Sequence, residues 1–258
     1  MFKGQIVAIT GASGGIGRAI AQMFIAQGAK VAISDRVLPG DTAAEIGASA
    51  YICDVSKEDN LVAFIDSVEA DLGPIDVFVS NAGVGFGDGM HVAGADNKAW
   101  ELSWQINVMS SVYAARRLIP YWTERKSGRF IITASAAGLL SQIGSASYTA
   151  TKHAAVAFAD SIAIEHADDG VQVHCICPQY VRTNMTKGLK MAEEGQDQLL
   201  EPVDVANSLL EAMKKDEFLV LPHKTVHDYT IGRAQDHTGW VKGMVRFRRS
   251  LKSENMPL

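Results

Sequence analysis

Residues 5–35 read QIVAITGASGGIGRAIAQMFIAQGAKVAISD, and the fold of the chain can be predicted from this segment outward. A short apolar run leads through a glycine-rich turn into a segment of helical periodicity, and a second apolar run ends at Asp35. Short apolar runs bounded by turn residues are typical of strands buried on both faces, which helices join in parallel sheets. The stretch therefore predicts a strand, a helix and a second, parallel strand.

The same alternation continues along the chain. Further strand-like runs are SAYICD, PIDVFVSNAG, GRFIITAS, VQVHCICP and FLVLP, and helical segments are expected at about 56–72, 100–124, 147–167 and from near Pro202. No linker, repeat or low-complexity tract interrupts the series. We therefore predict an α/β fold, a Rossmann-type doubly wound parallel sheet flanked by helices. Residues 1–258 would form a single domain, with about 225–258 as a C-terminal helical extension.

Composition excludes several classes of protein. The 258 residues are 47% hydrophobic and 21% charged with a formal net charge of −5, which argues against disorder and against a nucleic-acid binder. The three cysteines form no C-x-x-C pair, so neither a disulfide framework nor a zinc cluster is expected, and the seven histidines show no ligand spacing. No apolar run reaches the length of a membrane span. We expect a cytoplasmic protein without a catalytic metal.

The turn after the first strand carries the pattern G-x-x-x-G-x-G at Gly11, Gly15 and Gly17. In a strand-turn-helix context these glycines let the chain turn sharply, let the backbone approach a pyrophosphate, and let the helix pack closely on the strand. The loop contains no lysine, so it does not match the phosphate loop of kinases and nucleotide hydrolases. The pattern predicts a dinucleotide site.

The second strand ends at Asp35, 18 positions beyond Gly17. A carboxylate at about this spacing accepts hydrogen bonds from the adenosine ribose and would repel a 2′-phosphate. The neighbouring Arg36 could stack on adenine or neutralise a phosphate. The spacing favours NAD as the cofactor and leaves NADP as the alternative.

Tyr148 and Lys152 stand at i and i+4 at the start of an expected helix, hence on one face. A free phenol, with a pKa of about 10, is a weak base near neutral pH, but a nearby ammonium and an oxidised nicotinamide both favour the phenolate. Tyr148 could then act as general base in oxidation and general acid in reduction. Ser135 ends a predicted strand, where its hydroxyl could reach the same reacting oxygen.

These ordered motifs resemble those of the short-chain dehydrogenase/reductase family in its NAD-type form. The resemblance extends from about Lys3 to Thr186. The residues that carry it are Thr10-Gly11 through Gly15-Ile16-Gly17 in the loop, the adenine-contacting pair Asp54-Val55, Asn81-Ala82-Gly83, and the set of Asn107, Ser135, Tyr148 and Lys152.

The resemblance implies a role for each member of that last set. Tyr148 would be the acid/base, Lys152 would hold the nicotinamide ribose and lower the tyrosine pKa, Ser135 would donate to the substrate oxygen, and Asn107 would hold a water in the proton relay. Ile16 would contact the nicotinamide side and Thr183 the carboxamide. The full set of implied cofactor contacts is Gly11, Ser13, Gly14, Gly15, Ile16, Gly17, Asp35, Arg36, Asp54, Val55, Asn81, Ala82, Gly83, Tyr148, Lys152, Pro178, Val181 and Thr183.

One position departs from the family pattern, because Gln179 follows Pro178 where a glycine is usual. The backbone there lacks the freedom of glycine, which bears on the geometry of the nicotinamide loop and the substrate pocket. Substrate choice should depend on residues 84–94, 138–146 and 179–191. Their apolar members are Phe86, Met90, Leu139, Leu140, Ile143, Tyr180, Met185, Leu189 and Met191. This apolar character suggests a hydrophobic secondary alcohol or ketone.

The two long helices at 100–124 and 147–167 follow the pattern that packs against a second subunit in the family, which implies a homodimer or homotetramer. The tail has apolar residues at helical spacing from Trp240 to Leu251, interleaved with Lys and Arg. It predicts a basic amphipathic helix that either packs within the protein or an oligomer, or lies on a membrane surface.

Together these features predict an NAD-dependent oxidoreductase acting on the CH–OH group of a small molecule. Two alternatives stay open. One is a catalytically silent dinucleotide-binding regulator, which would not need the set of Ser135, Tyr148, Lys152 and Asn107. The other is an NADP-dependent ketone reductase, in which Arg36 would outweigh Asp35.

Overall fold

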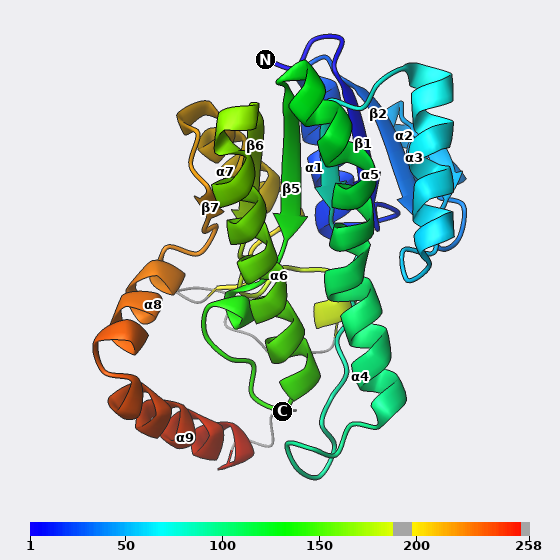
Figure 1. The fold of residues 1–258 in the computed structure, drawn as a ribbon. Helices are drawn as coiled ribbons and strands as arrows, with labels where there is room; N and C mark the ends of the chain where they lie inside the picture. The colour runs from blue at the N-terminus through cyan, green and yellow to red at the C-terminus, as the bar shows by residue number, and fades with distance from the viewer. Residues whose placement is uncertain (188–197, 254–258) are drawn as a thin grey trace.

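The computed structural model describes residues 1–187 and 198–253, and within these residues one sheet of seven parallel strands runs through the protein (Figure 1). The strand order is β3-β2-β1-β4-β5-β6-β7. The strands are β1 (Ile6–Thr10), β2 (Lys30–Asp35), β3 (Ser49–Ile52), β4 (Val77–Ser80), β5 (Gly128–Thr133), β6 (Val171–Ile176) and β7 (Leu219–Val220). The order reverses between β1 and β4, where doubly wound sheets bind their ligands. The predicted α/β fold is confirmed.

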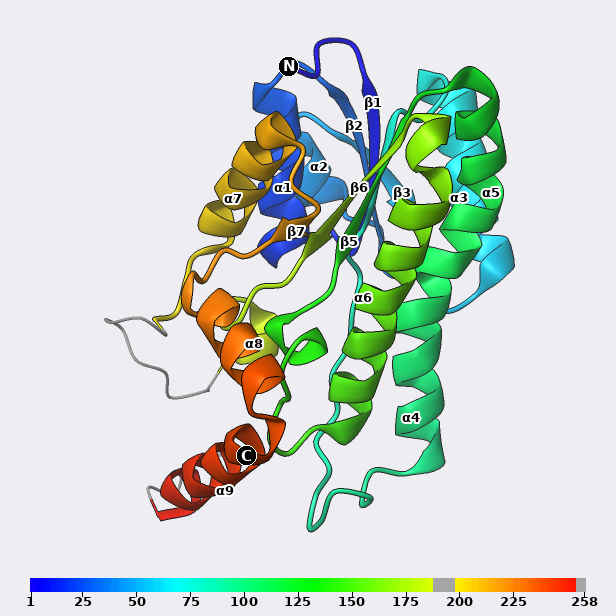
Figure 2. The same cartoon turned by 60° about the vertical axis from the view of Figure 1, so that its left-hand side comes forward.

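Helices cover both faces of the sheet (Figure 2). One face carries α1 (Gly15–Ala26), α2 (Gly40–Ile46) and α7 (Pro202–Lys215); the other carries α3 (Glu58–Leu72), α5 (Ser110–Arg125) and α6 (Ala146–His166). Phe24 and Ile33 belong to the core of the first face, and Phe78 and Trp122 to that of the second. Because both faces are covered, every residue of β1 is buried, as its uninterrupted apolar run predicts.

The helix predicted at 100–124 is not regular. It begins as α4 (Asn97–Trp104), passes through a π-helical turn, η1 (Gln105–Met109), and continues as α5. A π-turn inserts one extra residue into the helical ladder, and such turns occur frequently at functional sites. No residue type marks a π-turn, so the sequence pattern predicts an ordinary helix here. The turn carries Asn107, one of the candidate site residues.

The chain beyond β7 forms two helices, α8 (Thr225–Gln235) and α9 (His237–Ser253). The first residues of α8, Thr225 and Val226, are buried, whereas α9 projects away from the sheet (Figures 1 and 2). The amphipathic helix predicted for the tail is therefore present. Among the described residues, no helix combines the length and apolar character needed to cross a bilayer.

Candidate active site

A cleft of about 460 Å³ lies at the carboxyl edge of the sheet. Its wall brings together the glycine loop, Asp35 at the end of β2, Ser135 after β5, and Tyr148 and Lys152 of α6. Of the predicted site residues, Gly17 and Asn107 lie outside the wall. The other predicted cofactor and catalytic positions line one cavity although they are scattered over most of the chain.

Backbone angles and close contacts explain why the loop has glycine at three positions. Gly11 and Gly15 have φ angles of +64° and +55°, which L side chains rarely adopt. A Cβ at Gly17 would lie 2.6 Å from both the Asn81 side-chain nitrogen and the Gly11 carbonyl oxygen. That Asn81 nitrogen donates to the carbonyls of Thr10 and Gly11 at 3.1 and 2.9 Å. Gly17 therefore makes room for the amide that fixes the loop, behind the cavity wall.

The N-terminus of α1 opens onto the cleft at Gly14. No described side chain caps this end, and its first turn contains no acidic residue. A Cβ at Gly14 would meet no described atom within 4 Å. The first backbone N–H groups of a helix have no partner within it, and the helix dipole makes this end partly positive. The residues thus fit the pyrophosphate of a dinucleotide.

Asp35 lies at the far end of the cleft from α6. Its Oδ2 accepts from the Ser13 hydroxyl at 2.6 Å and from the Ser13 backbone N–H at 3.3 Å, and its Oδ1 accepts from the Arg36 N–H at 2.8 Å. Asp54 and Val55, expected at the adenine, line the same end. The carboxylate is thus held against the glycine loop, where its negative charge faces the position that the ribose would take.

Ser135, Tyr148 and Lys152 meet at the other end. Lys152 is 3% exposed, and its Nζ donates to the Thr133 carbonyl at 2.8 Å and lies 5.6 Å from the centre of the Tyr148 ring. Ser135 lies two residues after the end of β5, and its Oγ accepts from the Ala137 N–H at 3.1 Å. The end of β5 therefore positions both Ser135 and, through the Thr133 carbonyl, the Lys152 ammonium.

Burial dominates the protonation of this pair. It raises the pKa of the Tyr148 phenol, with the Ser135 side chain acting in the opposite direction. It lowers the pKa of the Lys152 ammonium to about 8. Burial is the larger effect on Tyr148, so its pKa is raised in the protein without a cofactor, and the effect expected of Lys152 on the phenol stays a prediction. In this state Tyr148 is held as a phenol, the form that donates a proton.

Asn107 supports the site from behind its wall. Its Oδ1 accepts from the Val84 N–H at 2.9 Å, and its Nδ2 donates to the Val84 carbonyl at 2.9 Å and to the Thr151 hydroxyl at 3.0 Å. A side-chain amide that makes these bonds joins the chain after β4 to helix α6. Its spacing from Tyr148 gives no indication of this connection.

Gln179 takes the place of the usual glycine without backbone strain. Among the described non-glycine residues, only Lys126 and Asp216 have a positive φ. The Gln179 N–H donates to Nδ1 of buried His223 at 3.2 Å, and Pro178, Gln179, Val181 and Thr183 all line the cleft. The loop after β6 therefore reaches the cavity without a glycine at this position.

Asp88 supports the site from outside the cleft wall, and the sequence reasoning missed it. It is 5% exposed, and its two carboxylate oxygens accept from the Ala146 N–H, at the first residue of α6, at 2.8 and 3.0 Å. The Asp88 N–H in turn donates to the Gly144 carbonyl at 2.8 Å. Ala146 lies two residues before Tyr148, so Asp88 fixes the start of the helix that carries the tyrosine. A cap that comes from 58 positions upstream leaves no local sequence signal.

The segments expected to select the substrate contribute unequally. Met185 lines the cleft, whereas Met90 is 99% exposed at the tip of its loop and takes no part in the wall. Leu189 and Met191 lie outside the described residues. The other apolar members are partly buried in their segments, and Leu139 packs against the core.

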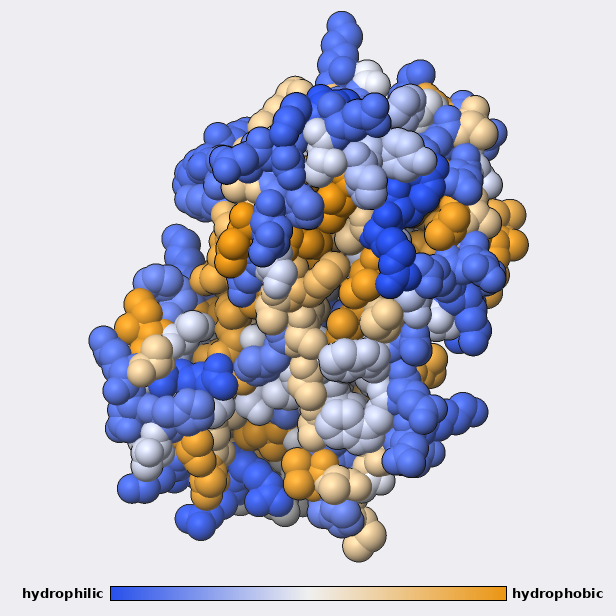
Figure 3. All heavy atoms as spheres, viewed as in Figure 1, coloured by the Kyte–Doolittle hydropathy of each residue, from blue (hydrophilic) through white to orange (hydrophobic). Residues whose placement is uncertain are grey.

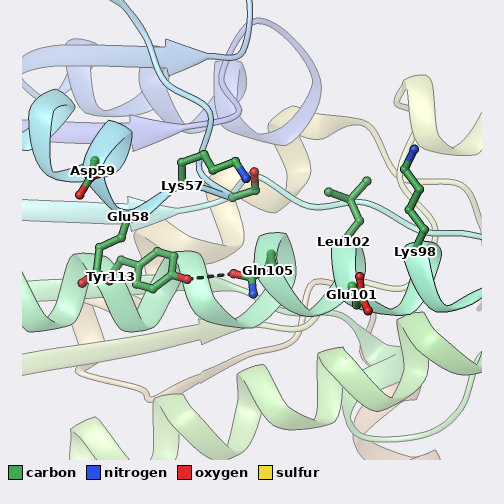
Figure 4. Close-up of a pocket in the computed structure, with 9 residues that line it drawn as sticks. Lys57, Glu58, Asp59, Lys98, Glu101, Leu102, Gln105 and Tyr113 are labelled. Atoms are coloured by element: carbon green, nitrogen blue, oxygen red, sulfur yellow. Dashed lines mark hydrogen bonds between the residues drawn. The ribbon is translucent and has the colours of Figure 1, made fainter.

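A second hollow, also of about 460 Å³, lies between the start of α3 and helices α4 and α5 (Figure 4). Its described lining carries charges of both signs, from Lys57, Glu58, Lys98 and Glu101 among others, and the Tyr113 hydroxyl donates to Gln105 at 2.8 Å. None of the predicted catalytic residues is in this lining. Ser135, Tyr148 and Lys152 lie instead in the cleft at the sheet edge.

The family follows from comparison with known proteins. A family model described as short chain dehydrogenase matches residues 5–194. The chain belongs to the short-chain dehydrogenase/reductase family. Like the family resemblance in the sequence, the match covers the glycine loop, the chain after β4 and helix α6.

Two curated relatives and one solved structure place the chain within this family. It is 35% identical over 193 residues to a sorbose reductase of Candida albicans, covering 71% of this chain and 69% of the relative. It is 33% identical over 202 residues to 3beta-hydroxysteroid dehydrogenase 2 of Eggerthella lenta, covering 75% and 77%. A short-chain dehydrogenase/reductase from Burkholderia phymatum in complex with NAD has a TM-score of 0.78 at 25% identity, over 91% of this chain and 94% of that one.

Proposed function

We propose that this member of the short-chain dehydrogenase/reductase family is an NAD-dependent oxidoreductase that interconverts a secondary alcohol and its ketone. The observation that supports this most is that Ser135, Tyr148 and Lys152 line the same cavity as the uncapped start of α1. A regulator that only binds a dinucleotide would need the uncapped start of α1 but not the three side chains. We treat residues 1–258 as one functional unit, and the buried free thiols of its cysteines suit a reducing cytoplasm.

The cofactor would lie along the cleft, with its pyrophosphate at Gly14 and Gly15 and its adenosine ribose at Asp35. The Asp35 carboxylate accepts hydrogen bonds, which suits ribose hydroxyls and opposes a 2′-phosphate. When bound, NAD would supply the acceptor for the hydrogen that leaves the alcohol carbon with its electron pair. Lys152, close to Tyr148, would hold the nicotinamide ribose.

The proton would move through Tyr148. In oxidation its phenolate oxygen would take the proton of the alcohol hydroxyl, and in reduction its phenol would return a proton to the ketone oxygen. Ser135 would donate a hydrogen bond to that same oxygen. A phenol is protonated at neutral pH, and the raised pKa of Tyr148 means that the phenolate needed for oxidation is harder to form in the protein without a cofactor. Asn107 would steady the wall through Val84 and Thr151.

We propose a hydrophobic substrate. Val84, Leu102, Ile106 and Met185 supply apolar surface to the cleft beside the catalytic group. The names of the relatives include both a sugar and a steroid, so the polarity of the substrate is the first property to measure.

The test measures turnover of a panel of aliphatic, alicyclic and aryl secondary alcohols, with small polyols for comparison. NADH formation reports the turnover of each compound. Tyr148→Phe should lower turnover by about 10²- to 10⁴-fold, the usual contribution of a positioned acid/base, and should leave NADH binding largely unchanged. Tyr113→Phe, outside the cleft, is the matched control. Preferred turnover of polyols would overturn the hydrophobic substrate. NADH binding without turnover of any panel member would favour the regulator, and tighter binding of NADPH would favour the reductase that uses NADP.

A further inference from the structure

His223 is a buried histidine that follows β7 and that the proposed chemistry does not use. It is 3% exposed. The helices that come after it, α8 and α9, present a largely hydrophilic surface, interrupted by apolar residues, at the lower left of Figure 3. Burying an imidazole ring costs free energy unless its nitrogens have hydrogen-bond partners. The burial of His223 therefore directs attention to what its ring binds.

The two ring nitrogens of His223 have partners whose roles are fixed. The backbone N–H of Gln179 donates to Nδ1 at 3.2 Å, so Nδ1 must present a lone pair. Nε2 lies 3.2 Å from the carbonyl oxygen of Gln198, which can only accept, so Nε2 must carry a proton. These two bonds require a neutral ring in a single tautomer. His223 thus joins the loop after β6 to the segment that leads into α7.

The bond to Gln179 forms at the point where the sheet stops holding the chain. The Cys177 N–H donates to the Val220 carbonyl at 2.9 Å and extends the pairing of β6 with β7. Pro178 has no N–H to donate. Gln179 therefore carries the next N–H of the loop, and His223, three residues after Val220, accepts it. The chain that pairs with β6 also holds the loop that follows β6.

The same peptide group is held on its other side by the catalytic end of the cleft. The Pro178 carbonyl accepts from the Ala136 N–H at 2.8 Å and from the Ser135 hydroxyl at 3.5 Å. In a trans peptide the C=O and the N–H point in opposite directions. His223 and the turn at Ser135 and Ala136 therefore bind opposite edges of the peptide plane between Pro178 and Gln179.

The side chain at position 179 opposes rotation of this peptide. Turning the plane over would bring the φ angle of Gln179 to positive values, as between turns of type I and type II. Glycine adopts such angles freely, whereas a residue with a Cβ rarely does. Gln179 does not have a positive φ. The residue that departs from the family pattern therefore favours one orientation of the peptide, and this is the orientation that His223 binds.

We propose that His223 is a positioning residue that holds the Pro178–Gln179 peptide with its carbonyl against Ser135 and Ala136. The consequence for turnover rests on the proposed function, in which Ser135 donates to the reacting oxygen. If this peptide rotated, the carbonyl beside Ser135 would leave and the hydroxyl would lose its fixed direction. Small errors in the placement of such a group slow the reaction strongly.

Two replacements of similar size separate the hydrogen bond from the packing. His223→Asn keeps a side-chain oxygen that can accept from the Gln179 N–H, whereas His223→Leu has only methyl groups there. Both are too short to replace the bond from Nε2 to Gln198. His227→Leu is the control, because His227 is an exposed histidine four residues further along the chain. Circular dichroism and thermal unfolding establish whether the variants fold.

Hydrogen–deuterium exchange of the Gln179 amide, resolved by mass spectrometry with electron-transfer fragmentation, measures the hold on the peptide without any substrate. His223→Leu should exchange this amide about tenfold faster than the wild type, because a backbone N–H without its partner is less protected. His223→Asn and the control should stay close to the wild type. Equal exchange in His223→Asn and His223→Leu would overturn the proposal.

Turnover of the best substrate from the alcohol panel tests the consequence for catalysis. The kcat of His223→Leu should fall about tenfold or more below that of His223→Asn. Equal kcat in the two variants of an active protein would overturn the positioning role. A wild-type protein that turns over no substrate would overturn the proposed function instead, and the exchange of the Gln179 amide would still confirm or overturn the hold on the peptide.

A measurement on the wild type covers the case in which His223→Leu does not fold. The ¹⁵N chemical shifts of the histidine rings report which nitrogen carries the proton, and the signal lost in His223→Asn identifies His223. A proton on Nε2 and none on Nδ1 is the expected result. A proton on Nδ1 in the folded protein would overturn the proposal, because Gln179 could then not donate to it.

Discussion

Replacing Asp88 by alanine removes a buried carboxylate that accepts from the first N–H of α6 at 2.8 and 3.0 Å. Hydrogen bonds to charged groups contribute about 1.5–3 kcal/mol, and the loss of an acidic group at a helix N-terminus adds to the cost. We expect the free energy of unfolding to fall by about 2 kcal/mol. For a chain of this size that is a decrease in Tm of about 4–8 °C.

The same change should lower kcat, because Tyr148 stands two residues beyond Ala146 and α6 would no longer be fixed at its start. Small displacements of a catalytic group slow the reaction strongly, so kcat is expected to fall about tenfold or more. Asp96→Ala is the control. Asp96 also caps a helix, accepting from the Ala99 N–H at 2.7 Å, but it is exposed and caps α4.

Chemical denaturation measures the stability of the two variants, and turnover of the best substrate from the alcohol panel measures their activity. Asp96→Ala should cost about 1 kcal/mol, the usual value of a cap, with kcat unchanged. If Asp88→Ala retained the full kcat while losing stability, or if both variants lost kcat alike, the link from Asp88 to Tyr148 would be refuted.

Three further predictions concern the cofactor loop, the adenosine end and a buried histidine. Gly17→Ala places a methyl group 2.6 Å from the Asn81 nitrogen and the Gly11 carbonyl, and should weaken NADH binding at least tenfold in a fluorescence titration; unchanged affinity would contradict the crowding. Asp35→Ser removes the charge that opposes a 2′-phosphate, and the ratio of the Kd for NADPH to that for NADH should fall about tenfold; an unchanged ratio would show that Asp35 does not select NAD. Burial lowers the pKa of fully buried His174. Below about pH 6.5 the unfolded chain therefore binds a proton that the folded protein does not, and the free energy of unfolding should decrease as the pH is lowered towards the pKa of the folded state. His174→Gln should flatten this dependence in denaturation curves between pH 7 and 5, and an equally steep curve would contradict it.

The cofactor half of the site could be predicted from local sequence because it depends on backbone shape. Gly11 and Gly15 must be glycines in any chain that makes this turn, and their positive φ angles show why. The protonation state of Tyr148 could not be predicted in the same way. The neighbouring Lys152 leads one to expect a lowered pKa, but burial, which depends on everything packed around the ring, raises the pKa of Tyr148.

Local sequence was enough to predict the alternation of strands and helices, the glycine-rich loop and the order of the candidate catalytic residues, because these follow from periodicity and from residue types at short spacing. The tertiary structure was needed to find that Asp88 caps α6 and that Asn107 lies in a π-turn behind the wall of the cleft. Each of these depends on which distant segments come together when the chain folds. Contacts between segments tens of residues apart leave no pattern within either one.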